Sequence, residues 1–274
     1  MASDSVSFWH SSFYKFAALS DPQAVAARLK ILSASVTGSI LLATEGINGM
    51  VAAPLDALDA FEKALHEEFD GVFAGMQFKR SACVTQPFKH MRVKVKREIV
   101  ALGVPGINAI DRPRQALQPQ AWRALIARDD VVVLDNRNSF EYKLGRFKGA
   151  VDPGVLHFRD FPRYIEEQAP QWKAEGKKVA MYCTGGIRCE KTSAWMHDMG
   201  VEVFELQGGI LNYFLEMPDP EKDWQGECFV FDNRTALDSK LQETHTSIEE
   251  VYKDEPDREW RISRARRLAA SEDD

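Results

Sequence analysis

The sequence contains few cysteines, and none of their spacings indicates a disulfide framework or a zinc site. The 274 residues include four, Cys83, Cys183, Cys189 and Cys228, and no pair forms CxxC. A chain of this length needs no disulfides to fold, and a structural zinc site usually requires paired ligands. We therefore expect reduced thiols, for which the simplest location is the cytoplasm.

Long apolar runs and an export signal are also missing. No apolar window of about eighteen residues is present, and the first residues, MASDSVSFWHSSF, contain neither the basic nor the apolar segment of a signal peptide. We therefore expect no membrane association. The net charge of −6 excludes a protein that is basic throughout but permits a local basic surface.

Signatures of metal and dinucleotide sites are absent as well. The six histidines form no HxH, HxD or HExxH pattern, and no glycine-rich dinucleotide fingerprint occurs. The sequence thus predicts no metal ligands, and neither a cofactor nor an obligate protein partner can be read from it.

The first ninety or so residues alternate between strand and helix patterns. Strand patterns lie at 11–19, 38–43, 49–53 and 76–82, and helix patterns follow Asp21-Pro22 and span 55–69. The order β-α-β-β-α-β is typical of a ferredoxin-like α+β domain. Between two of the strands, the EGIN segment predicts a tight turn, with Asn48 and Gly49 suited to positive φ.

A basic stretch, FKHMRVKVKREIV, follows at residues 88–100. Its charges alternate with Met91, Val93 and Val95, so a strand would carry several charges on one face. That face is either simply solvated or a nucleic-acid surface, to which Lys79 and Arg80 would add if they lie nearby. The candidate nucleic-acid-binding residues are Lys89, Arg92, Lys94 and Lys96.

A second alternating pattern follows a segment that contains several prolines. Strand patterns at 131–135, 179–182 and 203–206 alternate with helix patterns, among them one at 192–199, which is typical of a parallel α/β sheet. We predict a ferredoxin-like domain with the basic strand at 1–102, a linker at 103–118, a parallel-sheet domain at 119–218 and a partly flexible, charged extension at 219–274. Within that extension, residues 258–270 fit either a short surface helix or disordered chain.

Cys183 lies just past the second central strand, where open α/β sheets bind their ligands. The residues that follow it are Thr184, Gly185, Gly186, Ile187 and Arg188. Loop N–H groups, the positive end of a helix dipole and the guanidinium of Arg188 would all stabilise a thiolate. The pattern predicts an activated cysteine that acts on a polyanionic partner. Cys189 either packs on the following helix or resolves an oxidised Cys183.

Several motifs of the second domain resemble those of rhodaneses, namely LDNR at 134–137, EY at 141–142, GRFKGA at 145–150, CTGGIR at 183–188 and LQGGI at 206–210. The resemblance implies a rhodanese-like parallel-sheet domain and a persulfide on Cys183, with the loop amides of residues 184–187 around its outer sulfur. It also implies that Arg137 braces the loop through Glu141. Arg146 stands where many rhodaneses have histidine and would shape the pocket rim.

Longer segments resemble a narrower family, the bacterial oxygen-dependent tRNA uridine(34) hydroxylases. They are EGINGMV, YKLGRFKGAVDP, FRDFPRY, CTGGIRCEK and GECFVFDNR, and the resemblance runs from about Phe13 to Asn233. It implies formation of 5-hydroxyuridine at the wobble position, with tRNA as partner and molecular oxygen as co-substrate. The chain departs from the family in lacking a cysteine-containing C-terminal segment, since no cysteine follows Cys228.

Three functions remain open at this point. The first is hydroxylation of wobble uridine by an oxidoreductase of the monooxygenase type. The second is sulfur transfer through a persulfide on Cys183, and the third is a non-enzymatic module that binds tRNA or protein.

Overall fold

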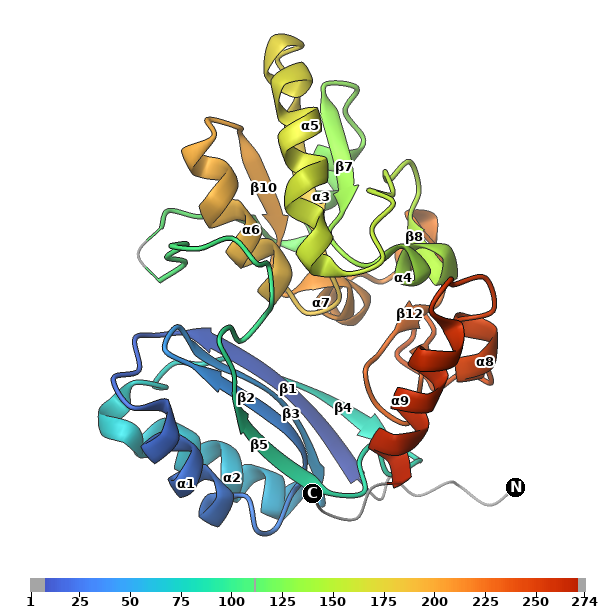
Figure 1. Cartoon of the computed structure of the whole chain (residues 1–274). Coiled ribbons are helices and arrows are strands. Elements are labelled where there is room, and N and C mark those ends of the chain that lie inside the picture. The colour runs from blue at the N-terminus through green and yellow to red at the C-terminus, as the bar shows by residue number, and fades with distance from the viewer. Residues whose placement is uncertain (1–7, 111, 271–274) are drawn as a thin grey trace. The chain divides into compact units, whose positions relative to one another are not determined.

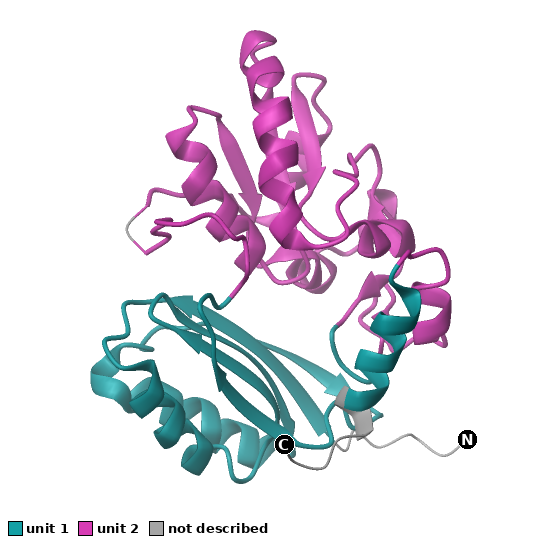
Figure 2. Ribbon diagram, viewed as in Figure 1, with its two compact units in different colours: residues 1–99, 231–234, 257–274 teal, residues 100–230, 235–256 magenta. Residues whose placement is uncertain are grey.

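The computed structural model describes residues 8–110 and 112–270, which form two compact units (Figure 1, Figure 2). Unit 1 comprises the chain up to Ile99 together with Phe231–Arg234 and the chain from Asp257 on. Unit 2 comprises Val100–Val230 and Thr235–Pro256. The residues predicted as a C-terminal extension are thus divided between both units.

Unit 1 is built on one five-stranded sheet, in the order β4-β1-β3-β2-β5. Its strands are β1 (Phe8–Phe16), β2 (Thr37–Ala43), β3 (Gly46–Ala53), β4 (Phe78–Cys83) and β5 (Met91–Val95). Neighbouring strands among the first four are antiparallel, whereas β5 adds at the edge parallel to β2. With α1 (Pro22–Leu32) between β1 and β2 and α2 (Leu55–Glu67) between β3 and β4, the predicted ferredoxin-like order is confirmed.

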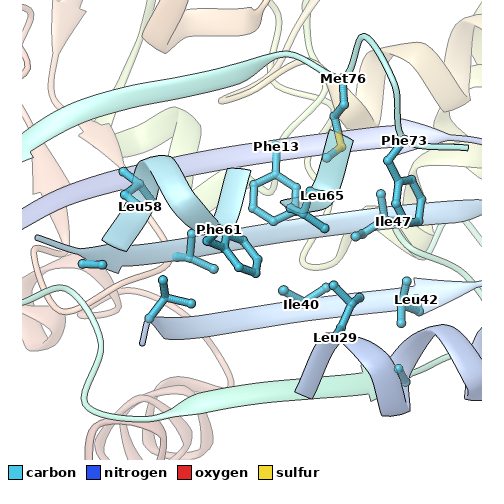
Figure 3. Packing of buried hydrophobic residues seen from close by; sticks show 14 of the residues in the cluster. Phe13, Leu29, Ile40, Leu42, Ile47, Leu58, Phe61, Leu65, Phe73 and Met76 are labelled. Carbon is cyan, nitrogen blue, oxygen red and sulfur yellow. The ribbon is translucent and has the colours of Figure 1, made fainter. Parts of the chain in front are cut away.

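The helices of unit 1 cover one face of this sheet and form its core with it (Figure 3). Asp21 caps α1 by accepting hydrogen bonds from the N–H groups of Gln23 and Ala24, and Pro22 starts the helix. The fully buried members of the core include Leu29, Ile40, Leu42, Ile47, Leu58 and Leu65. Burial of each such side chain contributes about 1.5–3 kcal/mol, so this face is the main source of the unit's stability.

The EGIN prediction was wrong in its backbone detail. The chain turns before Gly46, which has φ 141°, while Asn48 and Gly49 lie within β3 and are not among the positive-φ residues. Gly49 is needed for space instead, because a Cβ there would approach the Phe13 ring to 2.4 Å. A sequence pattern does not distinguish a glycine required for its φ from one required for close packing.

Unit 2 contains a four-stranded parallel sheet in the order β6-β10-β9-β7. Its strands are β6 (Ala116–Leu117), β7 (Val131–Asp135), β9 (Lys178–Tyr182) and β10 (Val203–Leu206). Its helices are α3 (Pro119–Ile126), α4 (Ser139–Leu144), α5 (Phe161–Ala174), α6 (Ile187–Asp198) and α7 (Gly209–Glu216). Two separate clusters of buried residues pack against the sheet, as a parallel sheet with two covered faces requires.

Shorter elements complete the fold. Strand β8 (Gly145–Phe147) pairs with β11 (Trp224–Gly226), and β12 (Cys228–Phe229) pairs with β13 (Ala236–Leu237). The 3₁₀ helices lie at Phe69–Gly71, Phe158–Asp160 and Pro220–Lys222, and the last helices are α8 (Ile248–Val251) and α9 (Arg258–Ala270). Across residues 8–110 and 112–270, no helix combines the length and apolar character needed to cross a bilayer.

Candidate active site

Cys183 directly follows β9, and the loop after it leads into α6. Gly186 is the N-cap of α6 and has φ 102°, a conformation that residues with a Cβ rarely adopt. The helix begins at Ile187, five residues before the predicted start at 192. Both Arg188 and Cys189 therefore belong to the first turn of α6, at the positive end of its dipole.

The environment of Cys183 favours its thiolate. Burial opposes ionisation, because Cys183 is 1% exposed. A side-chain hydrogen bond from Cys189, the charge of Arg188 and the N–H groups of Cys189 and Gly186 outweigh that burial and lower the pKa of Cys183 to about 5. The Gly186 N–H lies 3.1 Å from Sγ. At pH 7 such a thiol is roughly 99% ionised, against about 3% for an ordinary cysteine.

Cys189 is the hydrogen-bond partner of this thiolate. It is fully buried, and burial together with the neighbouring Cys183 raises its pKa well above the usual value, so it keeps its proton. Asn136 Nδ2 lies 3.9 Å from its Sγ and donates to Thr192 Oγ1 at 3.0 Å. Cys189 is therefore both packed in the core and in contact with Cys183, which leaves its role as a resolving thiol a hypothesis.

Arg188 is held by Glu141. Its Nη1 and Nη2 donate to the two carboxylate oxygens at 2.7 and 2.9 Å, and Nη2 also donates to Thr184 Oγ1 at 3.2 Å. Burial opposes the charge of Glu141, but the attraction of Arg188 and the hydrogen bond from it prevail and lower the pKa of Glu141. The bidentate geometry fixes the guanidinium beside Cys183 and ties the loop to α4.

The implied pairing of Arg137 with Glu141 was wrong. The ion-pair partner of Arg137 is Asp135, whose carboxylate oxygens accept from its Nε and Nη2 at 2.8 and 2.6 Å. Both side chains are completely buried, and the Tyr182 hydroxyl donates to Asp135 at 2.7 Å. Arg137 also donates to the Gly145 carbonyl at 2.6 Å, so it joins the end of β7 to β8. The sequence spacing of Arg137 and Glu141 did not reveal that Glu141 turns toward α6.

The turn between β10 and α7 supports the loop from the other side, which motif analysis alone did not reveal. The N–H groups of Ile210 and Leu211 donate to the carbonyls of Cys183 and Thr184 at 2.9 and 3.2 Å. Gly209 makes this approach possible, because a Cβ there would come within 2.5 Å of the Cys183 carbonyl oxygen. The glycine pair of LQGGI is the sequence signal for this contact.

Cys228 behaves differently from the other two cysteines of unit 2. Burial raises its pKa to about 12, with the carboxylates of Glu141 and Asp135 adding to the shift and the arginines opposing it. Its thiol donates to the Phe229 carbonyl at 3.7 Å. Of the three thiols, only that of Cys183 is stabilised as an anion.

Among the described residues, no three His, Cys, Asp or Glu side chains gather as a metal site requires. No metal ligands were predicted and no cofactor could be read from the sequence, and this observation does not test either point. Arg146, predicted to shape the pocket rim, stacks on the Tyr142 ring with its guanidinium carbon 4.7 Å from the centroid.

The candidate nucleic-acid-binding residues lie in unit 1, on and beside β5. Met91, Val93 and Val95 pack against the core, so Arg92 and Lys94 lie on the opposite face of the sheet. Lys96 follows the strand and Lys89 precedes it, and both are exposed. We call the sheet face that bears Arg92 and Lys94, opposite α1 and α2, the open face.

The register places further polar residues on the open face. Arg92 pairs with Ser39, Ser39 with Met50, Met50 with Ser12, and Ser12 with Lys79. One row therefore crosses all five strands with a cation at each end, about 19 Å apart by the usual strand spacing.

Arg80 does not contribute to the open face. Its guanidinium pairs with Glu62 at 2.5 Å and with Asp59 at 2.7 Å, both on α2. Lys79 does lie on the open face, but at the edge farthest from β5, since β4 and β5 are the two outer strands.

Two domain families match the chain in the order of the two units. Residues 9–99 match the UPF0176 acylphosphatase like domain, and residues 118–216 match the Rhodanese-like domain. Proteins named tRNA uridine(34) hydroxylase are similar over most of the chain. The one from Acinetobacter baumannii (strain AYE) is 44% identical over 85% of this chain and 73% of its own length. The one from Synechococcus elongatus is 45% identical over 84% of this chain and 86% of its own length.

The chain belongs to the tRNA uridine(34) hydroxylase family. A third relative of that name, from Legionella pneumophila (strain Corby), is 39% identical over 89% of this chain and 95% of its own length. The predicted family and fold class, a ferredoxin-like domain followed by a rhodanese-like domain, are thereby confirmed. In this family member the Cys183 thiolate, Cys189 and the Arg188–Glu141 pair form the candidate active site.

Proposed function

We propose that the protein hydroxylates C5 of uridine 34 in tRNA, with molecular oxygen as co-substrate and Cys183 as the essential residue. The observation that carries the proposal is a cysteine whose pKa is lowered to about 5, in a chain that belongs to the tRNA uridine(34) hydroxylase family. The proposed class is an oxidoreductase of the monooxygenase type. Its proposed location is the cytoplasm, where tRNA and reduced thiols are found.

We assign the nucleophilic sulfur to Cys183, either as a thiolate or as a persulfide. Arg188 and the Gly186 N–H stabilise the negative charge of the thiolate on Sγ, and Glu141 holds Arg188 in place. A persulfide carries its reactive sulfur about 2 Å beyond Sγ. That extension is one way in which a cysteine that is only 1% exposed can reach a macromolecular substrate.

The deciding experiment is nucleoside mass spectrometry of tRNA from a strain that lacks the gene, complemented with wild-type protein or Cys183→Ala and grown with and without air. We expect 5-hydroxyuridine with the wild-type protein in air, and none with Cys183→Ala or without air. The matched control, Cys228→Ala, removes a protonated buried thiol and should leave the modification in place. Full modification with Cys183→Ala would refute the proposed role of this cysteine.

We also propose that tRNA contacts the open face of unit 1. Arg92 and Lys94 supply charge from β5, Lys89 and Lys96 extend it on either side, and Lys79 supplies charge at the far edge. Tyr14 lies on the same face with the Lys79 ammonium 5.3 Å from its ring centroid. Cations bind phosphates, and aromatic rings stack with unpaired bases, so this face has the chemistry that RNA requires.

Salt dependence of tRNA binding tests the open face. Arg92→Gln with Lys94→Gln should weaken binding and reduce the slope of log Kd against log salt by about 1.4–1.8, which corresponds to two lost phosphate contacts. Lys63→Gln is the matched control, because Lys63 is exposed on α2. An unchanged slope in the double variant would mean that this strand face is merely solvated.

Sulfur transfer is the second candidate, favoured by the rhodanese-like domain and its anion-stabilising loop. In this function Cys183 takes sulfane sulfur from a donor such as thiosulfate and passes it to an acceptor. Rapid cyanolysis through Cys183, with no change in tRNA modification on deletion of the gene, would favour it over hydroxylation. An unreactive Cys183 and tRNA binding without turnover would instead favour a binding module.

A further inference from the structure

The last helix, α9, lies outside both matched domain families and belongs to unit 1 (Figure 2). Its sequence, REWRISRARRLAA, contains five arginines and one glutamate, in a chain with a net charge of −6. A local reversal of charge of this kind is the electrostatic footprint of a polyanion partner.

One face of α9 is used for packing. Arg261 and Ile262 are 7% and 9% exposed, and Arg261 Nε donates to Asp257 at 2.5 Å, one turn earlier. This face is therefore not open to a partner, and Asp257 neutralises one of the five arginines. It does not include Trp260, Arg264 or Arg267.

The opposite face presents an aromatic ring and cations. Trp260, Arg264 and Arg267 follow at i, i+4 and i+7, so they form one stripe along the helix. Trp260 is 49% exposed, and the Arg264 guanidinium carbon lies 5.2 Å from its ring centroid. Arg264 and Arg267 are both exposed.

The composition of this stripe distinguishes RNA from other anionic surfaces. A guanidinium binds a phosphate through two parallel hydrogen bonds, and an indole ring stacks with an unpaired base. A membrane-bound helix needs a continuous apolar face, whereas the exposed face here has Trp260 as its one large apolar side chain among the described residues. The side chain of Ile262 is already buried.

We propose that the exposed face of α9, formed by Trp260, Arg264 and Arg267, binds the backbone and one unpaired base of the tRNA substrate. The proposal rests on the proposed function, which makes tRNA the substrate. It adds a contact that is separate from the Cys183 loop and from β5. The face contributes to affinity and takes no part in the chemical step.

The test uses the full chain and tRNA, with Kd measured by fluorescence anisotropy over a series of KCl concentrations. Arg264→Gln with Arg267→Gln should weaken binding and reduce the salt slope by about 1.4–1.8. Trp260→Ala should weaken binding on the order of tenfold with an unchanged salt slope, and Trp260→Phe should restore most of it. Arg163→Gln is the matched control, because that arginine is 87% exposed on α5.

Steady-state kinetics with tRNA distinguish a failure of this inference from a failure of the proposed function. The α9 variants should raise KM for tRNA and leave kcat unchanged, whereas Cys183→Ala should bind tRNA normally and form no product. Wild-type levels of affinity and salt slope in the α9 variants would overturn the inference and leave the proposed function intact. Failure of the wild-type protein to bind tRNA would overturn both. Loss of binding to phosphatidylglycerol vesicles without loss of tRNA binding would assign α9 to membranes instead.

Discussion

The contact between Cys183 and Cys189 leads to a specific prediction about the pKa of Cys183. Cys189 keeps its proton and donates it toward the Cys183 sulfur, which is the largest of the contributions that lower the pKa of Cys183 against the effect of burial. Cys189→Ala removes this donor while leaving Arg188 and the Gly186 N–H in place. The pKa of Cys183 should therefore rise from about 5 toward, but not up to, the 9.0 of a free thiol.

The expected size of the shift is about 1–2 pH units, the usual effect of one hydrogen bond to a charged group. The assay is thiolate absorbance at 240 nm as a function of pH, with Cys183→Ala as the blank. Absorbance is preferable to alkylation because a sulfur that is 1% exposed reacts slowly whatever its charge. The wild-type protein should titrate near pH 5, and Cys189→Ala should titrate near pH 6–7.

Cys189→Ser is the matched variant, because it is close in size to cysteine and keeps a hydrogen-bond donor. It should stay near the wild-type midpoint if the donor is what matters. Cys189→Ala with an unchanged midpoint would refute the reasoning and leave Arg188 as the main cause of the acidity. Equal upward shifts in the Ala and Ser variants would instead indicate a packing effect.

Three further predictions concern stability and loop geometry. Glu141→Gln leaves the buried Arg188 without its carboxylate and should cost about 3–5 kcal/mol in urea unfolding, whereas an unchanged midpoint would show that the pair adds nothing. Burial and the charge of Arg234 lower the pKa of His10 to about 3, so between pH 6.5 and pH 3 only the unfolded chain gains a proton at this residue. The free energy of unfolding should therefore fall by about 1.4 kcal/mol per pH unit from pH 6.5 toward pH 3. Urea unfolding of His10→Phe should lack this pH-dependent loss. Gly209→Ala, at φ 71° and with a Cβ 2.5 Å from the Cys183 carbonyl oxygen, should abolish the thiolate absorbance at pH 7, and normal absorbance would show that the loop tolerates the change.

The fold was predictable because it follows from the periodicity of apolar residues and from the order of helices and strands along the chain. The apolar stripe of α2 indicates a helix that covers one face of a sheet, and the unbroken apolar run of β7 indicates a buried parallel strand. The first and last residues of helices and strands were less predictable, and at α6 the difference changes the position of Cys189. With a helix starting at 192, Cys189 would lie in the loop, whereas in the structure it lies in the first turn and contacts Cys183.

Pairing among buried charges was not predictable, because spacing along the chain does not determine which way a side chain turns. Glu141 is four residues from Arg137 and forty-seven from Arg188, yet its carboxylate bonds Arg188. Arg137 instead pairs with Asp135, two residues before it. Only the fold, which brings α4 against the start of α6, decides between these partners.

This arrangement separates the buried charges of unit 2 into two sets with different roles. Asp135 and Arg137 neutralise each other at the end of β7, and their further hydrogen-bond partners are the Tyr182 hydroxyl and the Gly145 carbonyl. Glu141 and Arg188 also neutralise each other, but Arg188 lies close enough to Cys183 to lower its pKa. With Cys183 ionised, the two pairs and the thiolate sum to one negative charge.

The neighbouring thiol of Cys228 stays protonated mainly because it is buried. Burial raises the pKa of Cys228 to about 12, and the carboxylates of Glu141 and Asp135 add to the shift while the two arginines oppose it. Cys189 likewise keeps its proton, because burial and the hydrogen bond that it donates to the Cys183 thiolate both raise its pKa. The site therefore ionises one cysteine of three, and the one selected is the cysteine that the loop N–H of Gly186 and the dipole of α6 can stabilise.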